Sequence, residues 1–202
     1  MNVLALELST SCGSLALLSE DAEVTRHWPN DRKNSGPFFQ HLADIQKQFI
    51  RLDVIIVGLG PGSYAGTRIA ISAAIGMQMA SGARLVGLPS ICAMECSEPE
   101  YFMIGDARRQ TFFFARIRNH DVVEGPTLMS EFDLREKLTG AGDQVPVLAS
   151  EKLPQFGSEI KYPSARILAS LARDSNRGFI SSPLEPMYLR EPHITLPKPI
   201  AS

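Results

Sequence analysis

The sequence predicts an α/β protein built from two related lobes, the second shorter than the first. Three observations favour this fold class: an opening run of three strands, an alternation of helices and strands after it, and a second run of three strands about a hundred residues further on. The chain has 202 residues, 44% of them hydrophobic, which is enough to form one large core or two small ones.

The first lobe opens with an antiparallel meander whose segments alternate in hydrophobicity and end at turn residues. Its expected strands are residues 1–8, 13–19 and 22–28. A helix is expected at 37–50, because Pro37 suits a first turn and Leu42 and Phe49 lie on its apolar stripe. Phe39 lies outside that stripe, so the apolar face is wider than one core contact requires.

A glycine-rich loop then joins a buried strand at 54–57 to a second helix. Gly60 and Gly62 allow backbone conformations closed to other residues, and Pro61 stiffens the turn between them. Ser63 suits the N-cap of the helix, whose free N–H groups favour an anion. The spacing fits neither the P-loop nor the dinucleotide-binding fingerprint. A purely structural turn and an anion loop therefore both stay open.

The helix expected at 64–81 carries a single charge, Arg68. Small residues recur along it, and a helix that is apolar nearly all round must be buried on all sides. Two interpretations stay open, a central core helix or a helix that docks against a partner protein. The second predicts an interface formed by the two helices, with Phe39, Leu42, Phe49, Gly66, Ala70, Ala73, Ala74 and Met77.

The remaining elements complete the two lobes. We expect strands at 84–88, 101–106, 111–118, 122–125 and 145–148, and helices at 90–96, 130–138 and 164–175. This order is typical of the ribonuclease H-like fold, from which the lobes of the actin-like ATPase superfamily (actin, sugar kinases, heat-shock chaperones) are built. The expected division is 1–98 for the first lobe, 99–181 for an abbreviated second lobe, and 182–202 for a proline-rich tail with Tyr188 packed back on the body.

The two meanders align without a gap, although few residues are identical. The alignment places Glu7 on Asp106, each near the end of a first strand. Glu7 is where a ribonuclease H-like site would hold magnesium, but one carboxylate is not a metal site. We therefore expect no metal site, and only a possible nucleotide or anion loop formed by Glu7, Gly60, Gly62 and Ser63.

Composition and charge exclude several classes of protein. A net charge of −2 provides no general attraction to nucleic acid or to anionic membranes. Arg108 and Arg109 belong to a local basic cluster that we interpret as a strand edge or a partner contact. The three cysteines lack metal or redox spacing, and the sequence shows neither a membrane span nor a signal peptide. A cytoplasmic protein is expected.

Several motifs resemble one known family. The segment Gly60-Pro-Gly-Ser-Tyr-Ala-Gly-Thr-Arg-Ile69 is similar to the Gly-Pro-Gly-Ser-Phe-Thr-Gly-Leu-Arg-Ile signature of the TsaB (YeaZ) family. Leu4-Ala-Leu-Glu-Leu-Ser-Thr10 resembles that family's opening strand, in which aspartate usually stands at the position of Glu7. Later landmarks follow in the right order at Leu88–Ile91, Asp106–Arg109 and Pro186–Arg190.

The resemblance implies a non-catalytic subunit with no catalytic residue and no cofactor of its own. Its implied partners are a TsaD-like catalytic subunit, which transfers threonylcarbamoyl to adenosine in ANN-decoding tRNAs, and a TsaE-like ATPase. It also implies a homodimer when alone, only indirect contact with tRNA, and ATP or ADP with magnesium only at a shared interface. The alternative is an independent enzyme, a nucleotide-binding hydrolase or a glycoprotease-like peptidase that uses Glu7 and the Gly60 loop.

Overall fold

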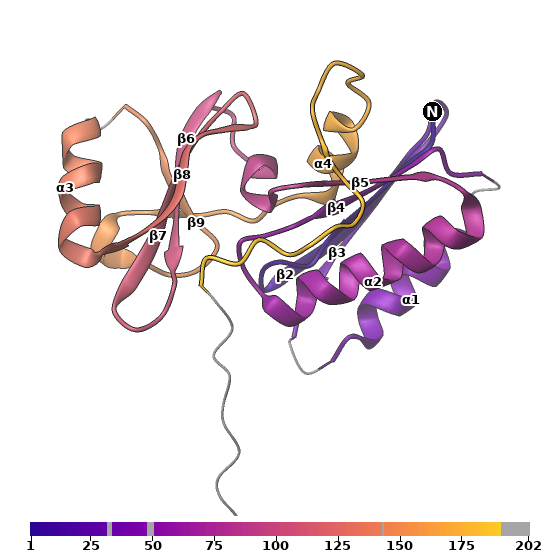
Figure 1. The fold of residues 1–202 in the computed structure, drawn as a ribbon, viewed down its shortest axis with the longest axis horizontal. Coiled ribbons are helices and arrows are strands. Elements are labelled where there is room, and N and C mark those ends of the chain that lie inside the picture. The colour runs from indigo at the N-terminus through magenta and orange to yellow at the C-terminus, as the bar shows by residue number, and fades with distance from the viewer. Residues whose placement is uncertain (32–33, 48–50, 143, 191–202) are drawn as a thin grey trace, which may run out of the picture.

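The structure, a computed structural model, describes residues 1–31, 34–47, 51–142 and 144–190. Two sheets lie next to each other and form two lobes (Figure 1). The first sheet has the order β11-β5-β4-β1-β2-β3. Its strands are β1 (Val3–Glu7), β2 (Cys12–Leu18), β3 (Glu23–Pro29), β4 (Val54–Gly58), β5 (Arg84–Leu88) and β11 (Ile180–Ser181).

The second sheet repeats the topology of the first. Its order is β10-β9-β6-β7-β8, with β6 (Glu100–Asp106), β7 (Thr111–Arg118), β8 (Asp121–Ser130), β9 (Val147–Ala149) and β10 (Glu159–Ile160). Each sheet consists of an antiparallel meander and two further strands that run parallel to the first strand of the meander. In the first sheet β4 pairs with β1 and β5 pairs with β4, and in the second sheet β9 pairs with β6 and β10 pairs with β9. The predicted fold class of two related lobes, the second abbreviated, is confirmed.

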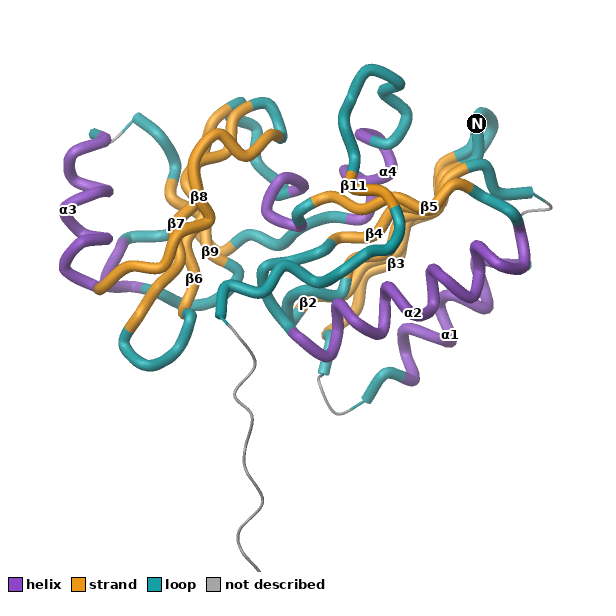
Figure 2. Tube along the Cα trace, in the orientation of Figure 1, coloured by secondary structure: helices purple, strands orange, loops and turns teal. Residues whose placement is uncertain are grey.

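The helices cover the sheets unequally. The first lobe has α1 (Gly36–Gln46) and α2 (Tyr64–Ser81) on one face and α4 (Ala165–Leu171) on the other, whereas the second lobe has α3 (Glu131–Ala141). Between β9 and β10, where the first lobe has α2, stands only the short 3₁₀ turn η2 (Pro154–Phe156). The second lobe is shorter mainly because of this replacement (Figure 2).

Strand alternation divides the hydrophobic core. On β1, Leu4 and Leu6 face α1 and α2, whereas Val3 and Ala5 face α4. The cluster beneath α4 also contains Met103 of β6 and residues of β7 and β9, so it continues from one lobe into the other. The two lobes therefore share part of their core.

Some predicted elements differ. The helix expected at 90–96 is only a 3₁₀ turn, η1 (Ser90–Ala93), because Met94 is extended and forms a bridge with Pro163. Strand β8 runs to Ser130, well past the predicted end at residue 125. The predicted second lobe, 99–181, included α4 and β11, but α4 packs on β1 and β2, and β11 pairs with β5 of the first sheet.

Candidate functional site

The glycine loop after β4 packs against the turn between β1 and β2. The Ser63 N–H donates to the Ser9 carbonyl at 2.6 Å. A Cβ on Gly62 would lie 2.1 Å from that carbonyl oxygen, and one on Gly66 would lie 2.1 Å from the Leu8 carbonyl oxygen. Only glycine allows the loop and the first turn of α2 to approach the strand ends this closely.

Gly60 and Ser63 of the loop already form hydrogen bonds with other residues of the chain. Ser90 binds both backbone groups of Gly60, since its hydroxyl accepts from the Gly60 N–H at 2.9 Å and its N–H donates to the Gly60 carbonyl at 2.7 Å. Ser63 is the N-cap of α2, as predicted, because its Oγ accepts from the Gly66 N–H at 3.2 Å. The loop is thus built first of all for close packing.

A cleft of about 600 Å³ lies between the lobes, next to the glycine loop. The first lobe contributes Ser9 and the start of α2, the second lobe contributes Ser150 and Glu151, and residues 187–190 contribute the third side. Three polar atoms of the lining are buried without a hydrogen-bond partner among the described residues: Ser9 Oγ, Ser150 Oγ and Arg190 Nε. Two hydroxyls and a guanidinium N–H are donors, so this cleft suits an anionic or strongly polar group.

The structure separates the four residues predicted as an anion loop. Gly62 and Ser63 line the cleft, whereas Glu7 and Gly60 do not. Glu7 is fully buried; its Oε1 accepts from the Ser9 N–H at 2.6 Å. Its Oε2 lies 1.7 Å from where a Cβ would stand on Gly58. The carboxyl group therefore points beneath β4, away from the cleft.

The surroundings of Glu7 do not fit magnesium. Burial raises the pKa of this carboxyl group, and the hydrogen bond from the Ser9 N–H opposes the shift only in part. A magnesium ligand must be reachable by the ion and its waters, and the fully buried carboxyl group of Glu7 is not. In the described parts of the chain no three His, Cys, Asp or Glu side chains come together as a metal site.

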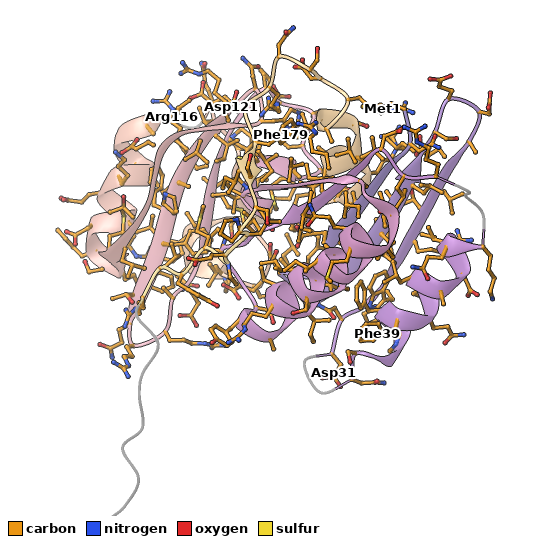
Figure 3. All side chains as sticks on the ribbon, turned by 45° about the vertical axis from the view of Figure 1, so that its right-hand side comes forward. Met1, Asp31, Phe39, Arg116, Asp121 and Phe179 are labelled. Atoms are coloured by element: carbon orange, nitrogen blue, oxygen red, sulfur yellow. The ribbon has the colours of Figure 1, made fainter. Side chains whose placement is uncertain are left out.

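The predicted partner interface on α1 and α2 requires a larger correction. Five of its eight residues are buried against the chain's own core: Leu42, Gly66, Ala70, Ala74 and Met77. Phe49 lies outside the described residues. Ala73 is half-buried, and Phe39 is 50% exposed at the first turn of α1, close to α2 (Figure 3). Most residues assigned to the interface therefore hold α1 and α2 on the sheet.

A different stripe of α2 faces outward. Met79 is 83% exposed and Ile75 39%. Beside this pair runs a row of small exposed residues, Ser72, Gly76 and Ala80, spaced one helical turn apart. Next to this stripe a groove of about 370 Å³ is lined by Phe39, Arg68, Ile69, Ser72 and Ala73. We call the stripe and the groove together the α1–α2 face. Most of the α2 residues predicted for the interface thus lie on its buried side, and its exposed side is formed by other residues.

Residues 184–190, the C-terminal strap, cross from one lobe to the other. Leu184 is buried beside Leu59, and the Met187 N–H donates to the Leu59 carbonyl at 2.7 Å. Tyr188 stacks on Tyr64 of α2 with ring centroids 5.1 Å apart. The strap then reaches the second lobe, where Arg190 donates to Thr111. The prediction that Tyr188 packs back on the body is confirmed.

No helix in the described part of the chain is long and apolar enough to cross a membrane.

Comparisons with known proteins agree with this architecture. A family model described as "TsaD: tRNA N6-adenosine threonylcarbamoyltransferase" matches residues 38–176, more than half of the chain. An uncharacterised protein of Mycobacterium leprae is 31% identical over 157 residues, which are 75% of this chain but 42% of that protein. An uncharacterised protein of Mycobacterium bovis is 29% identical over 165 residues, covering 79% of this chain and 73% of that protein. The chain thus spans less than half of the M. leprae relative.

Solved structures share the fold. A crystal structure of an uncharacterised Pseudomonas aeruginosa protein, described as similar to the peptidase YeaZ, has a TM-score of 0.69 at 20% identity, over 94% of this chain and 99% of that one. YeaZ from the same organism gives the same TM-score and identity over 93% of this chain and 99% of its own. The chain therefore belongs to the TsaD family and shares the fold of YeaZ, which confirms the resemblance to the TsaB (YeaZ) family that its motifs indicate.

Proposed function

We propose that this chain is a non-catalytic subunit that docks through its α1–α2 face on a TsaD-like catalytic subunit. The complex adds threonylcarbamoyl to adenosine in ANN-decoding tRNAs. Family membership supports the reaction, and the exposed stripe of α2 supports the docking. A TsaE-like ATPase joins the pair, and tRNA contacts this chain only indirectly. When alone, the chain forms a homodimer through the same face.

The observation that carries the proposal is Gly76, in the middle of α2. A Cβ at this position would meet nothing within 4 Å, so the chain's own packing does not require glycine there. Glycine in a helix interior costs about 1 kcal/mol relative to alanine. Glycine at this position lowers the stability of α2, and packing within the chain does not explain it. A partner helix that approaches closely would explain it, because a larger side chain would keep that helix away. The exposed side chains of Ile75 and Met79, in the neighbouring row of the helix, supply adaptable apolar contact.

Replacing Gly76 with arginine separates docking from folding. Arginine is a good helix former and has open space at this position, so we expect Gly76→Arg to fold at least as stably as the parent. Its long charged side chain should nevertheless prevent close approach of a partner helix. Binding to the purified TsaD-like protein of the same organism, measured by size exclusion and calorimetry, should be lost.

Gly140→Arg on α3 is the matched control, because Gly140 is also an exposed helical glycine with open space around it. This variant should bind the TsaD-like protein as the parent does. If Gly76→Arg kept the parent affinity, the α1–α2 face would not be the docking surface.

The rival function, an independent nucleotide hydrolase, is favoured by one observation: the unpartnered donors that line the interlobe cleft. The position of Glu7 beneath β4 argues against it, and we propose that ATP or ADP with magnesium binds only at an interface shared with the partners. Calorimetry with ATP and magnesium should give no saturable heat for the chain alone. Saturable binding that disappears in Ser9→Ala would favour the rival.

A further inference from the structure

The α1–α2 face contains one charge, Arg68, that no carboxylate of the described residues neutralises. Arg68 is the only charged residue of α2; it is exposed and lines the groove beside Phe39 and Ile69. Among the described residues it forms no ion pair. Its partners are instead neutral, since its guanidinium donates to the Tyr64 hydroxyl and lies over the Tyr64 ring, 5.0 Å from the centroid.

The guanidinium is held by Tyr64, and Tyr64 is in turn held by the C-terminal strap. Tyr64 contacts it from one turn earlier on α2, and Tyr188 of the C-terminal strap stacks on Tyr64. Both tyrosine rings are about half exposed. Because less side-chain entropy is lost when a guanidinium is already oriented, this cluster is prepared for binding in a way that a free surface arginine is not. Tyrosine and arginine are also the residues that most often dominate binding energy at interfaces.

The face itself supplies no free carboxylate to Arg68. Within α1 and α2 the only acidic residue is Asp44, and its carboxylate is paired with Lys47 at 2.9 Å. A second copy of the chain that docked through the same face would bring another Arg68 and no free carboxylate from these helices. Because burying an arginine without a partner is costly, such a homodimer leaves this site unsatisfied.

We propose, on the basis of the docking function above, that Arg68 selects the partner. It receives a carboxylate from a helix of the partner protein, and an apolar side chain of the same helix enters the groove lined by Phe39, Ile69 and Ala73. A planar guanidinium binds a carboxylate through two parallel hydrogen bonds, which adds direction as well as charge. The same pair makes the heteromeric complex preferred over the homodimer.

Calorimetric titration of the full chain with its TsaD-like partner, at about 0.1 M and 0.5 M salt, tests this proposal. Arg68→Met keeps most of the apolar stem and removes the charge. We expect it to raise the Kd about tenfold and to abolish most of the salt dependence of binding. Arg68→Glu should weaken binding further, because it places two carboxylates together. A lysine in place of the matching partner carboxylate should restore binding to Arg68→Glu.

Self-association provides an independent readout. Analytical ultracentrifugation should show Arg68→Met to self-associate at least as strongly as the parent, because the homodimer has no carboxylate at this site to lose. The proposal is overturned if Arg68→Met binds the partner with parental Kd and salt dependence. In that case the binding of Gly76→Arg to the TsaD-like partner shows whether the docking function fails too. If Gly76→Arg does not bind the partner, the α1–α2 face is still the docking surface. If it binds as the parent does, the docking surface is rejected as well.

Discussion

At the scale of single residues, Glu7 shows how one side chain decides what a site can do. It stands at the end of β1, where a ribonuclease H-like site would hold magnesium, yet its carboxyl group occupies the space beside Gly58. Its raised pKa follows from complete burial. The residue therefore contributes to the packing between β1, β4 and Ser90 rather than to metal chemistry.

Glu7→Gln should stabilise the protein at neutral and alkaline pH. A carboxyl group whose folded pKa is raised favours the folded state fully only below its unfolded pKa, near 4.5, and that stability is lost as the pH rises towards the folded pKa. Glutamine has a similar shape and does not ionise. Urea unfolding should therefore show a gain for Glu7→Gln that grows as the pH rises above about 4.5. Equal pH profiles for parent and Glu7→Gln would contradict this role.

Two glycines of α2 should respond in opposite ways to the same substitution. Gly66→Ala places a Cβ 2.1 Å from the Leu8 carbonyl oxygen and should lower the free energy of unfolding by about 1–3 kcal/mol, as overpacking does. Gly76→Ala meets nothing and should raise it by up to about 1 kcal/mol. Urea denaturation of both variants checks the pair. Equal signs would show that the two faces of α2 are assigned wrongly.

At the scale of elements, α2 marks the limit of what the sequence could predict. Its existence, its N-cap Ser63 and its near lack of charge were all readable from the residues. The side of α2 that faces the sheet could not be predicted from the sequence. Small and apolar residues occur all around the helix, so no polar face marks the exposed side. The contacts that decide the orientation lie outside the helix, at the Leu8 and Ser9 carbonyls that require Gly62 and Gly66.

Short elements were missed for a related reason. The strands β10 and β11 have two residues each, so neither leaves an alternating pattern, and only pairing with β9 and β5 defines them. The return of α4 to the first sheet could not be predicted either, since it depends on tertiary packing. For the candidate site, the motifs located the glycine loop but not the cleft, which also needs Ser150 and the strap.

The C-terminal strap should contribute to stability like a core element. Leu184 is buried in the first-lobe core beside Leu59, so Leu184→Ala should lower the free energy of unfolding by about 2–5 kcal/mol. Urea denaturation of Leu184→Ala measures this loss. Val123→Ala is a suitable control, because Val123 is 50% exposed and should cost far less. If the two truncations cost the same, the strap is only loosely attached.

At the scale of the whole molecule, the two lobes should unfold together. Their common cluster beneath α4 contains residues of both sheets, and the strap binds both lobes. Trp28, the only tryptophan, reports on the first lobe, whereas circular dichroism reports on both. The two probes should give coincident urea transitions. A separate transition seen only by circular dichroism would mean that the second lobe unfolds independently.

The arrangement as a whole assigns different tasks to the two sides of the first lobe. One side, under α4, joins the second lobe, and the other leaves the α1–α2 face exposed, where we propose that a partner docks. We propose that this face makes the chain an activating subunit in tRNA modification.

Reconstituted threonylcarbamoyl transfer tests this proposed role. Purified TsaD-like and TsaE-like proteins of the same organism would be supplied with threonylcarbamoyl adenylate, ATP, magnesium and an ANN-decoding tRNA, and modified adenosine would be measured. Adding the parent chain or Gly140→Arg should start the reaction, and adding Gly76→Arg should not. Equal product with and without the parent chain, or full activity with Gly76→Arg, would contradict the account.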